Sequence, residues 1–136
     1  MTTPTHDAFL HPRRKGDRPL VVVGCMNFGS RTPESESRAI IDHALDRGLV
    51  HFDTANAYSD GASERILGAA LKDVPHARIA TKVGIGKLNG PTEGLAPATL
   101  LRAFDASLER LGRTSVDLLY LHAPDHRTPI DDTLGA

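Results

Sequence analysis

The chain has 136 residues, 40% of them hydrophobic and 24% charged, which is the composition of one ordinary globular domain. Its 16 Lys and Arg residues nearly balance 17 Asp and Glu residues, so no nucleic acid and no anionic membrane surface is expected as a partner. The single cysteine, Cys25, excludes a disulfide within the chain. No apolar run approaches the roughly 18 residues that cross a bilayer, and no signal peptide is evident, so a cytoplasmic location is expected.

Two regions are expected along the chain. Residues 1–19 carry charges and prolines and predict an irregular leader, whereas residues 20–136 alternate between strand-like and helix-like segments. The first of these segments, LVVVGCM at residues 20–26, is rich in β-branched residues and is typical of a strand buried on both faces.

A helix is expected over about residues 33–47. Thr32 is placed to act as its N-cap, Pro33 suits its first turn, and Gly48 follows a basic last turn. Apolar residues recur at three- and four-residue intervals and predict a face that covers the preceding strand. These residues are Ile40, Ile41, Ala44 and Leu45.

The alternation then repeats twice. Residues 49–55 and 77–83 are predicted to be strands, and residues 63–73 between them predict a helix. The apolar face of that helix is expected to consist of Ile66, Leu67, Ala70 and Leu71.

A third helix is predicted from Pro97, in its first turn, to the residue before Gly112. A fourth strand is expected at residues 115–122, and residues 130–136 predict the start of a fourth helix. The apolar stripe expected for the third helix is Leu101, Phe104, Leu108 and Leu111.

Strictly alternating strands and helices imply parallel strands joined by right-handed crossovers, and therefore an α/β fold. The candidates are a flavodoxin-like doubly wound sheet and the N-terminal half, about four βα units, of a (β/α)8 TIM barrel. A doubly wound sheet concentrates function at a switch point between strands. Polar residues at the ends of three consecutive strands therefore favour the half-barrel.

Those polar residues are Asp53, Tyr58, Lys82 and His122. Asp53 ends the second strand, Tyr58 follows it by five residues, and Lys82 and His122 end the next two strands. Because the carboxyl ends of parallel strands lie at one edge of the sheet, a shared pocket is expected. Taken singly, Asp53 could cap a turn, Lys82 could be a solvated charge and His122 a core histidine.

Two other kinds of site are not expected. His122 and His126 do not predict a metal pair, because the intervening proline excludes helical i, i+4 geometry and no cysteine or third histidine lies close in sequence. The glycines of VGIGKLNGPTEG lack the strand and helix context of a phosphate-binding loop.

The motifs FDTANAY, SER followed by LG, ATK and LYLH resemble the aldo-keto reductase superfamily. YSDGASE and YLHAPDHRTPIDDTL further resemble its aflatoxin-aldehyde reductase branch, and the resemblance runs from about residue 20 to the end of the chain. It implies a barrel that binds a nicotinamide cofactor without a Rossmann domain and reduces the aldehyde or ketone group of a small molecule. The branch implies NADPH as that cofactor.

The resemblance also assigns roles. Tyr58 donates a proton to the carbonyl oxygen, the ammonium of Lys82 favours the resulting phenolate, Asp53 orients Lys82, and His122 hydrogen-bonds the substrate carbonyl.

Asp53, together with Cys25 and Met26 at the end of the first strand, would contact the cofactor, and Cys25 stands where many relatives have threonine. A complete barrel has about 250 residues. The alternative is therefore a truncated, non-catalytic half-barrel fragment or interaction module, whose open sheet edges would favour self-association.

Overall fold

The computed structural model describes residues 21–87 and 92–136. The expected leader at residues 1–19 lies outside this part of the chain, as do residues 88–91 of the glycine-containing loop. The elements are β1 (Val23–Gly24), α1 (Glu34–Asp46), β2 (His51–Asp53), the short 3-10 helix η2 (Tyr58–Gly61), α2 (Ala62–Ala70), β3 (Arg78–Val83), α3 (Pro97–Leu111), β4 (Leu118–Leu121) and α4 (Ile130–Gly135).

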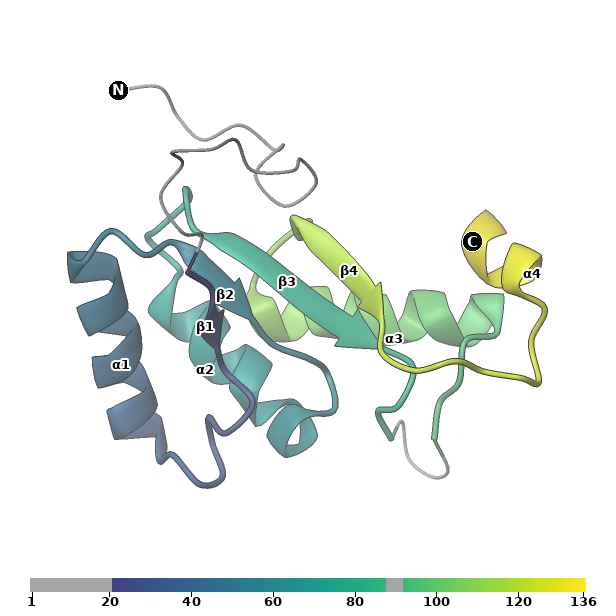
Figure 1. Ribbon diagram of the computed structural model, residues 1–136, viewed down its shortest axis with the longest axis horizontal. Coiled ribbons are helices and arrows are strands. Elements are labelled where there is room, and N and C mark those ends of the chain that lie inside the picture. The colour runs from purple at the N-terminus through teal and green to yellow at the C-terminus, as the bar shows by residue number, and fades with distance from the viewer. Residues whose placement is uncertain (1–20, 88–91) are drawn as a thin grey trace.

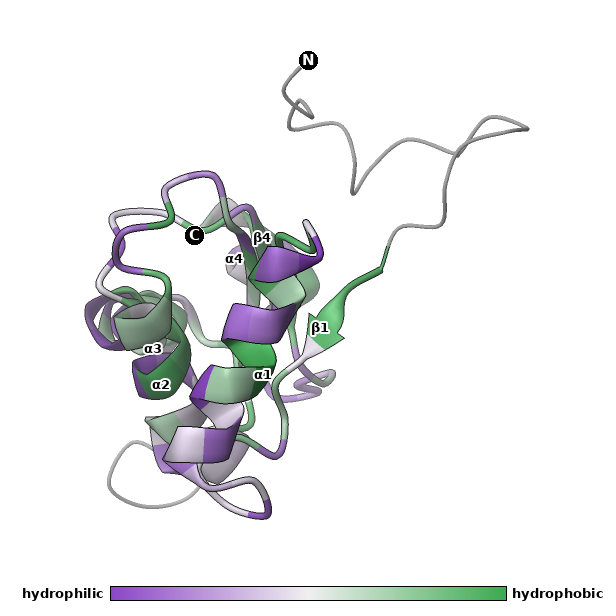
Figure 2. Cartoon of the chain, turned by 90° about the vertical axis from the view of Figure 1, so that its left-hand side faces the viewer, coloured by the Kyte–Doolittle hydropathy of each residue, from purple (hydrophilic) through white to green (hydrophobic). Residues whose placement is uncertain are grey.

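The strands form one parallel sheet in the order β1-β2-β3-β4, so each strand pairs with its neighbours in sequence. In register, Asp53 of β2 lies opposite Gly24 and Ala80, and Lys82 of β3 lies opposite Tyr120. Helices α2 and α3 lie behind the strands in Figure 1 and α1 lies to their left, and the side view of Figure 2 places α2 and α3 to one side of β1. The predicted α/β class with parallel strands is confirmed.

The first strand is shorter and more open than predicted. Only Val23 and Gly24 pair with β2, and Val21 and Val22 are 48% and 40% exposed. Burial on both faces was therefore a wrong prediction. The physical reason is that β1 is an edge strand, with no strand paired on its other side among the described residues.

Helix α1 differs from the expectation at its N-terminus and agrees with it at its C-terminus. Its N-cap is Pro33, and no side chain caps the first turn, so Thr32 does not have the predicted role. Instead the Ser37 hydroxyl donates to the carbonyl oxygens of Thr32 and Pro33, at 3.1 and 2.9 Å. The predicted C-terminal glycine is confirmed: Gly48 has φ +72° and its N–H donates to the carbonyl oxygen of Leu45.

The main core lies between the sheet and helices α1 and α2. Ile41 and Ala44 of α1 are buried in it, but Ile40 is 39% exposed, so its predicted place on the buried face is wrong. The predicted face of α2 is confirmed, because Ile66 and Leu67 are buried. The buried residues of this core are Cys25, Phe28, Ile41, Ala44, Phe52, Ile66, Leu67, Leu71, Ala77, Ile79 and Leu111.

Helix α3 has the predicted ends, with Pro97 in its first turn and Gly112 at φ +61° after its last. For three of its four residues the apolar stripe was predicted one position out of register, because Leu101 is 47% exposed and Leu100 is buried instead, whereas Leu111 is buried as predicted. The residues that α3 buries are Leu100, Ala103, Ser107 and Leu111. Two of them are small, which lets the helix approach the sheet and α2 closely.

Helices α2 and α3 are in close contact. A Cβ added to Gly68 would lie 2.6 Å from the backbone carbonyl of Leu111, so the contact requires glycine. The fully buried carboxylate of Glu64 accepts hydrogen bonds from Arg110 Nε, at 2.6 Å, and from the Thr81 hydroxyl. Glu64 therefore joins α2 to α3 and to β3, and fixes the strand that carries Lys82.

Candidate active site

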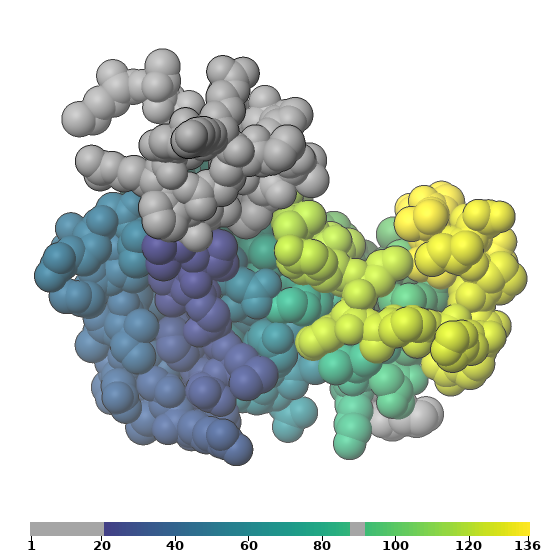
Figure 3. All heavy atoms as spheres, in the orientation of Figure 1, coloured from purple at the N-terminus to yellow at the C-terminus, as the bar shows by residue number. Residues whose placement is uncertain are grey.

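The face of the sheet that carries no helix turns toward the viewer in Figure 3, between β1 and β4. Side chains alternate along a strand. Thr81 and Val83 of β3 are fully buried on the helix side, so Lys82 between them points to the uncovered face. Asp53, at the carboxyl end of β2, lies on the same face and contacts Lys82.

The ammonium group of Lys82 contacts two of the other expected site residues and one backbone carbonyl. Nζ of Lys82 lies 2.6 Å from Oδ2 of Asp53, 3.2 Å from Oη of Tyr58 and 3.0 Å from the carbonyl oxygen of Thr54. An ammonium has three donors, and each has an acceptor here. The Lys82 side chain is therefore held in one place, and its exposed fraction is 15%.

The loop after β2 presents Tyr58 to this ammonium. The Tyr58 N–H donates to the carbonyl oxygen of Ala55 at 3.1 Å, which closes a tight turn. The next two residues, Ser59 and Asp60, both have φ +51°, a left-handed conformation that non-glycine residues rarely adopt. The Ser59 hydroxyl donates to the carbonyl oxygen of Phe28 at 2.8 Å. Backbone strain is thus located directly after Tyr58.

Electrostatics keep the ammonium of Lys82 charged. Burial alone would lower the pKa of Lys82, but its hydrogen bonds and attraction to Asp53 and Tyr58 raise that pKa above its ordinary value. Nζ also lies 4.9 Å from the centre of the Tyr58 ring. At neutral pH the rim therefore contains a fixed positive charge beside a phenol.

His122, the residue directly after β4, completes the cluster. Its backbone N–H donates to the carbonyl oxygen of Val83 at 2.8 Å, and its ring meets the Tyr58 ring edge to face, with centroids 5.6 Å apart and planes at 85°. Burial and the charge of Lys82 hold the pKa of His122 below its ordinary value. The imidazole is therefore neutral at neutral pH. Its Nδ1 is buried without a hydrogen-bond partner in the described part of the chain.

The two remaining expected site residues, Cys25 and Met26, differ in exposure. Cys25 is fully buried in the core, and burial, then the charge of Asp53, raises the pKa of its thiol to about 12. The thiol is therefore un-ionised at neutral pH, and it has no exposed surface. Met26 is 57% exposed.

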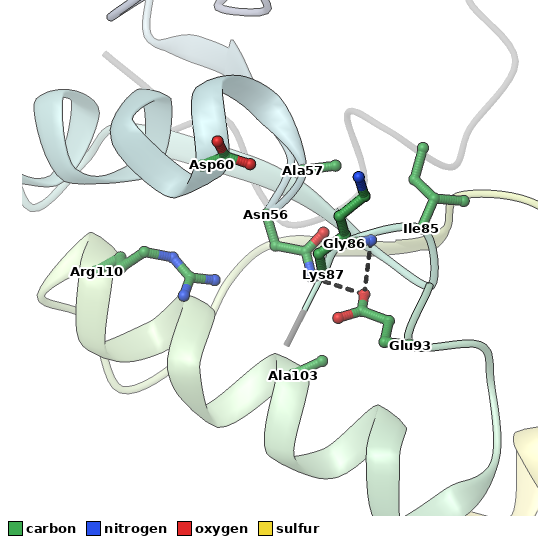
Figure 4. A pocket seen from close by; sticks show the side chains of 9 residues that line it. All are labelled: Asn56, Ala57, Asp60, Ile85, Gly86, Lys87, Glu93, Ala103 and Arg110. Atoms are coloured by element: carbon green, nitrogen blue, oxygen red, sulfur yellow. Dashed lines mark hydrogen bonds between the residues drawn. The ribbon is translucent and has the colours of Figure 1, made fainter. Parts of the chain in front are cut away.

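The sequence did not predict the hydrogen bond between Asn56 and Glu93. Both line a pocket of about 160 Å³ (Figure 4), whose lining does not include Asp53, Tyr58, Lys82 or His122. Asn56 donates a hydrogen bond to Glu93 at 2.7 Å. The sequence gives no signal for this contact, because 37 residues separate the partners and Glu93 lies in a loop without hydrophobic periodicity.

Neither a metal site nor a membrane span is present in the described residues. No group of three or more His, Cys, Asp or Glu side chains there could hold a metal ion. Within residues 21–87 and 92–136, no helix is long and apolar enough to cross a bilayer.

The model of the Aldo/keto reductase family matches residues 20–136. "Aflatoxin B1 aldehyde reductase member 2" of Mus musculus is 42% identical over 121 residues, which cover 88% of this chain and 32% of that protein. "Versiconal hemiacetal acetate reductase" of Aspergillus parasiticus is 36% identical, over 90% of this chain and 45% of that protein. The holo form of aldo-keto reductase AKR11C1 from Bacillus halodurans superposes with a TM-score of 0.77 at 34% identity, covering 85% of this chain and 40% of the neighbour.

These comparisons confirm the predicted resemblance, including its branch, and the predicted half-barrel. The thermostable aldo-keto reductase Tm1743, solved with the inhibitor epalrestat, likewise gives a TM-score of 0.75 over 90% of this chain and 45% of its own length. The chain therefore spans about a third of the length of the similar curated rodent proteins, and less than half of the length of these two barrel structures.

Proposed function

Because the chain belongs to the aldo/keto reductase family, we propose that residues 20–136 form the catalytic half of an enzyme that reduces aldehydes and ketones to alcohols with NADPH. One observation carries the proposal. A single ammonium, that of Lys82, contacts both the carboxylate of Asp53 and the hydroxyl of Tyr58 on the uncovered rim of the sheet. Such a group is suited to protonating an oxygen that gains negative charge.

The chemistry follows from the demands of carbonyl reduction. When a hydride adds to the carbonyl carbon, the oxygen becomes basic and needs a proton. The Tyr58 hydroxyl supplies that proton, and the adjacent ammonium of Lys82 stabilises the phenolate that remains. Asp53 holds the ammonium in place at 2.6 Å. The three residues act as one unit, with Tyr58 as the donor.

His122 serves as a hydrogen-bond donor to the carbonyl oxygen. Its neutral imidazole lies edge to face with Tyr58, so both side chains can reach the same oxygen. A neutral ring adds a hydrogen bond without a second positive charge beside Lys82. This orients the substrate and polarises its carbonyl group.

The residues present fit the nicotinamide end of the cofactor. Met26 offers an exposed apolar surface at the end of β1, and the Asp53 side chain is 29% exposed. These two side chains and the backbone at Cys25 would hold the ring, which supplies the hydride when bound. The preference for NADPH is inferred from similarity to the aflatoxin-aldehyde reductase branch.

The test is carbonyl reduction by the purified chain. Benzaldehyde and NADPH are supplied, and both NADPH oxidation and benzyl alcohol are measured. We expect the alcohol to appear in a one-to-one ratio with oxidised cofactor. No alcohol from benzaldehyde or from a panel of other aldehydes and ketones would contradict the proposal.

A second candidate, a non-catalytic interaction module, is favoured by apolar side chains at the β4 end of the molecule. Tyr120, Ile130 and Leu134 are 44%, 58% and 70% exposed. Such a surface favours association with another chain or copy. Light scattering during gel filtration discriminates the two, because this candidate predicts association that Leu134→Ser weakens and no carbonyl reduction.

A further inference from the structure

Glu93 lies in the segment between β3 and α3, and one of its oxygens accepts three hydrogen bonds. Oε1 accepts from the N–H of Gly84 at 2.6 Å, from the N–H of Gly86 at 3.2 Å and from Nδ2 of Asn56 at 2.7 Å. Figure 4 draws the last two of these contacts. The backbone after β3 thus wraps around a carboxylate that also binds the loop after β2.

These hydrogen bonds join the two segments that carry Tyr58 and Lys82. Asn56 precedes Tyr58 by two residues, and its backbone N–H donates to the carbonyl oxygen of Lys82 at 3.1 Å. Gly84 follows Lys82 by two residues. The carboxylate of Glu93 therefore fixes the loop of the proton donor against the end of the strand that carries the ammonium.

The local sequence permits this close approach. A Cβ at Gly86 would lie 2.8 Å from Nδ2 of Asn56, and Gly84 has φ +119°, so both positions suit glycine. The Asn56 side chain is buried, and removing its acceptor would leave a buried donor unsatisfied. The contact is consequently specific for an oxygen acceptor at position 93.

We propose that Glu93 is a positioning residue, one that holds Tyr58 within hydrogen-bond distance of Lys82. This inference rests on the proposed reductase function. Glu93 touches none of the reacting groups itself. Its contribution to turnover comes from the geometry of the 3.2 Å contact between Tyr58 and Lys82, to which proton transfer is sensitive.

Two substitutions at position 93 separate positioning from charge. Glu93→Ala removes the acceptor, whereas Glu93→Gln keeps an oxygen that can accept all three hydrogen bonds. Oε2 has no hydrogen-bond partner in the described residues, so an amide nitrogen in its place breaks no bond seen there. Glu109→Ala, which removes an exposed carboxylate from α3, is the matched control.

In carbonyl reduction, Glu93→Ala is expected to lower kcat about 10- to 100-fold with KM roughly unchanged. Glu93→Gln and Glu109→Ala should retain the wild-type kcat. In a double-mutant cycle, adding Asn56→Ala to Glu93→Ala should cause little further loss, because both remove the same contact. If Glu93→Ala does not fold, Asn56→Ala alone should lower kcat, and a wild-type kcat in that variant would overturn the inference.

A measurement independent of turnover keeps the two proposals apart. The rings of Tyr58 and His122 are close enough for a nuclear Overhauser effect, which Glu93→Ala should abolish and Glu93→Gln should retain. A wild-type chain without activity would contradict the reductase function, and the ring contact would still test Glu93. Retention of that contact in Glu93→Ala would overturn the positioning role.

Discussion

Nζ of Lys82 and Oδ2 of Asp53 lie 2.6 Å apart at the rim of the sheet, with exposed side-chain fractions of 15% and 29%. Both groups have lost much of their water, so their attraction is stronger than that of a surface pair. The pair raises the pKa of Lys82 against the effect of burial. Asp53, together with Tyr58, therefore raises the pH at which the ammonium loses its proton.

Asp53→Asn is expected to lower kcat about 10- to 100-fold and to move the alkaline limb of the pH profile to lower pH. The reason is that Lys82 loses the partner that raises its pKa, and so gives up its proton sooner. Initial rates between about pH 7 and pH 12 measure both effects, because the wild-type pKa of Lys82 lies above its ordinary value of about 10.4. An alkaline limb that stays in place would show that Lys82 is not the group it reports.

The same contact makes stability depend on alkaline pH. Because the pKa of Lys82 is raised in the folded state, its stabilising effect is complete below the unfolded-state pKa of about 10.4 and is lost as the pH rises through the folded value. Urea unfolding of wild type and Asp53→Asn across this range should show a smaller alkaline decline in the variant. Equal declines in the free energy of unfolding would show that the Lys82–Asp53 pair does not contribute to stability.

His122 should make the protein less stable in acid. Its pKa is lowered by burial and by Lys82, so the unfolded chain takes up a proton before the folded one as the pH falls below about 6.5. His122→Asn removes this titrating group and should make the free energy of unfolding fall less steeply as the pH is lowered. His51, whose pKa is also lowered by burial, keeps a second contribution, so some decline should remain. An unchanged pH dependence would contradict the neutral imidazole.

Gly68→Ala should destabilise the fold by about 2 kcal/mol, because the added Cβ meets the backbone carbonyl of Leu111 rather than a movable side chain. Gly24→Ala is the matched control, since nothing lies within 4 Å of a Cβ there. Urea unfolding of both variants gives the two free energies. Equal, small effects would mean that α2 and α3 can separate without cost.

The sequence was sufficient to predict those features that depend on local residue types and on the order of the strands. Proline and glycine at the ends of α3 act within one turn, and the ends of parallel strands must share an edge, so the approach of Asp53, Tyr58 and Lys82 followed from order alone. The prediction failed where burial depends on which neighbouring element a helix face packs against. Leu100 and Leu101 are the same residue type, and only packing against the sheet determines which of them is buried.

Two features of the site had no local signal. Ser59 and Asp60 adopt φ +51° because the surrounding structure holds them, not because their residue types favour it. Glu93 reaches Asn56 across 37 residues of sequence and follows a segment rich in glycine. Such contacts depend on the complete fold, so only coordinates can identify them.

The measurement that tests the central claim most directly is carbonyl reduction by Tyr58→Phe, compared with the wild-type chain at equal protein concentration. The variant keeps the ring against His122 and loses only the hydroxyl that Lys82 contacts. We predict a rate at least about 100-fold lower, with thermal unfolding nearly unchanged. Turnover equal to that of the wild type, in a variant that folds normally, would contradict the role of Tyr58 as proton donor.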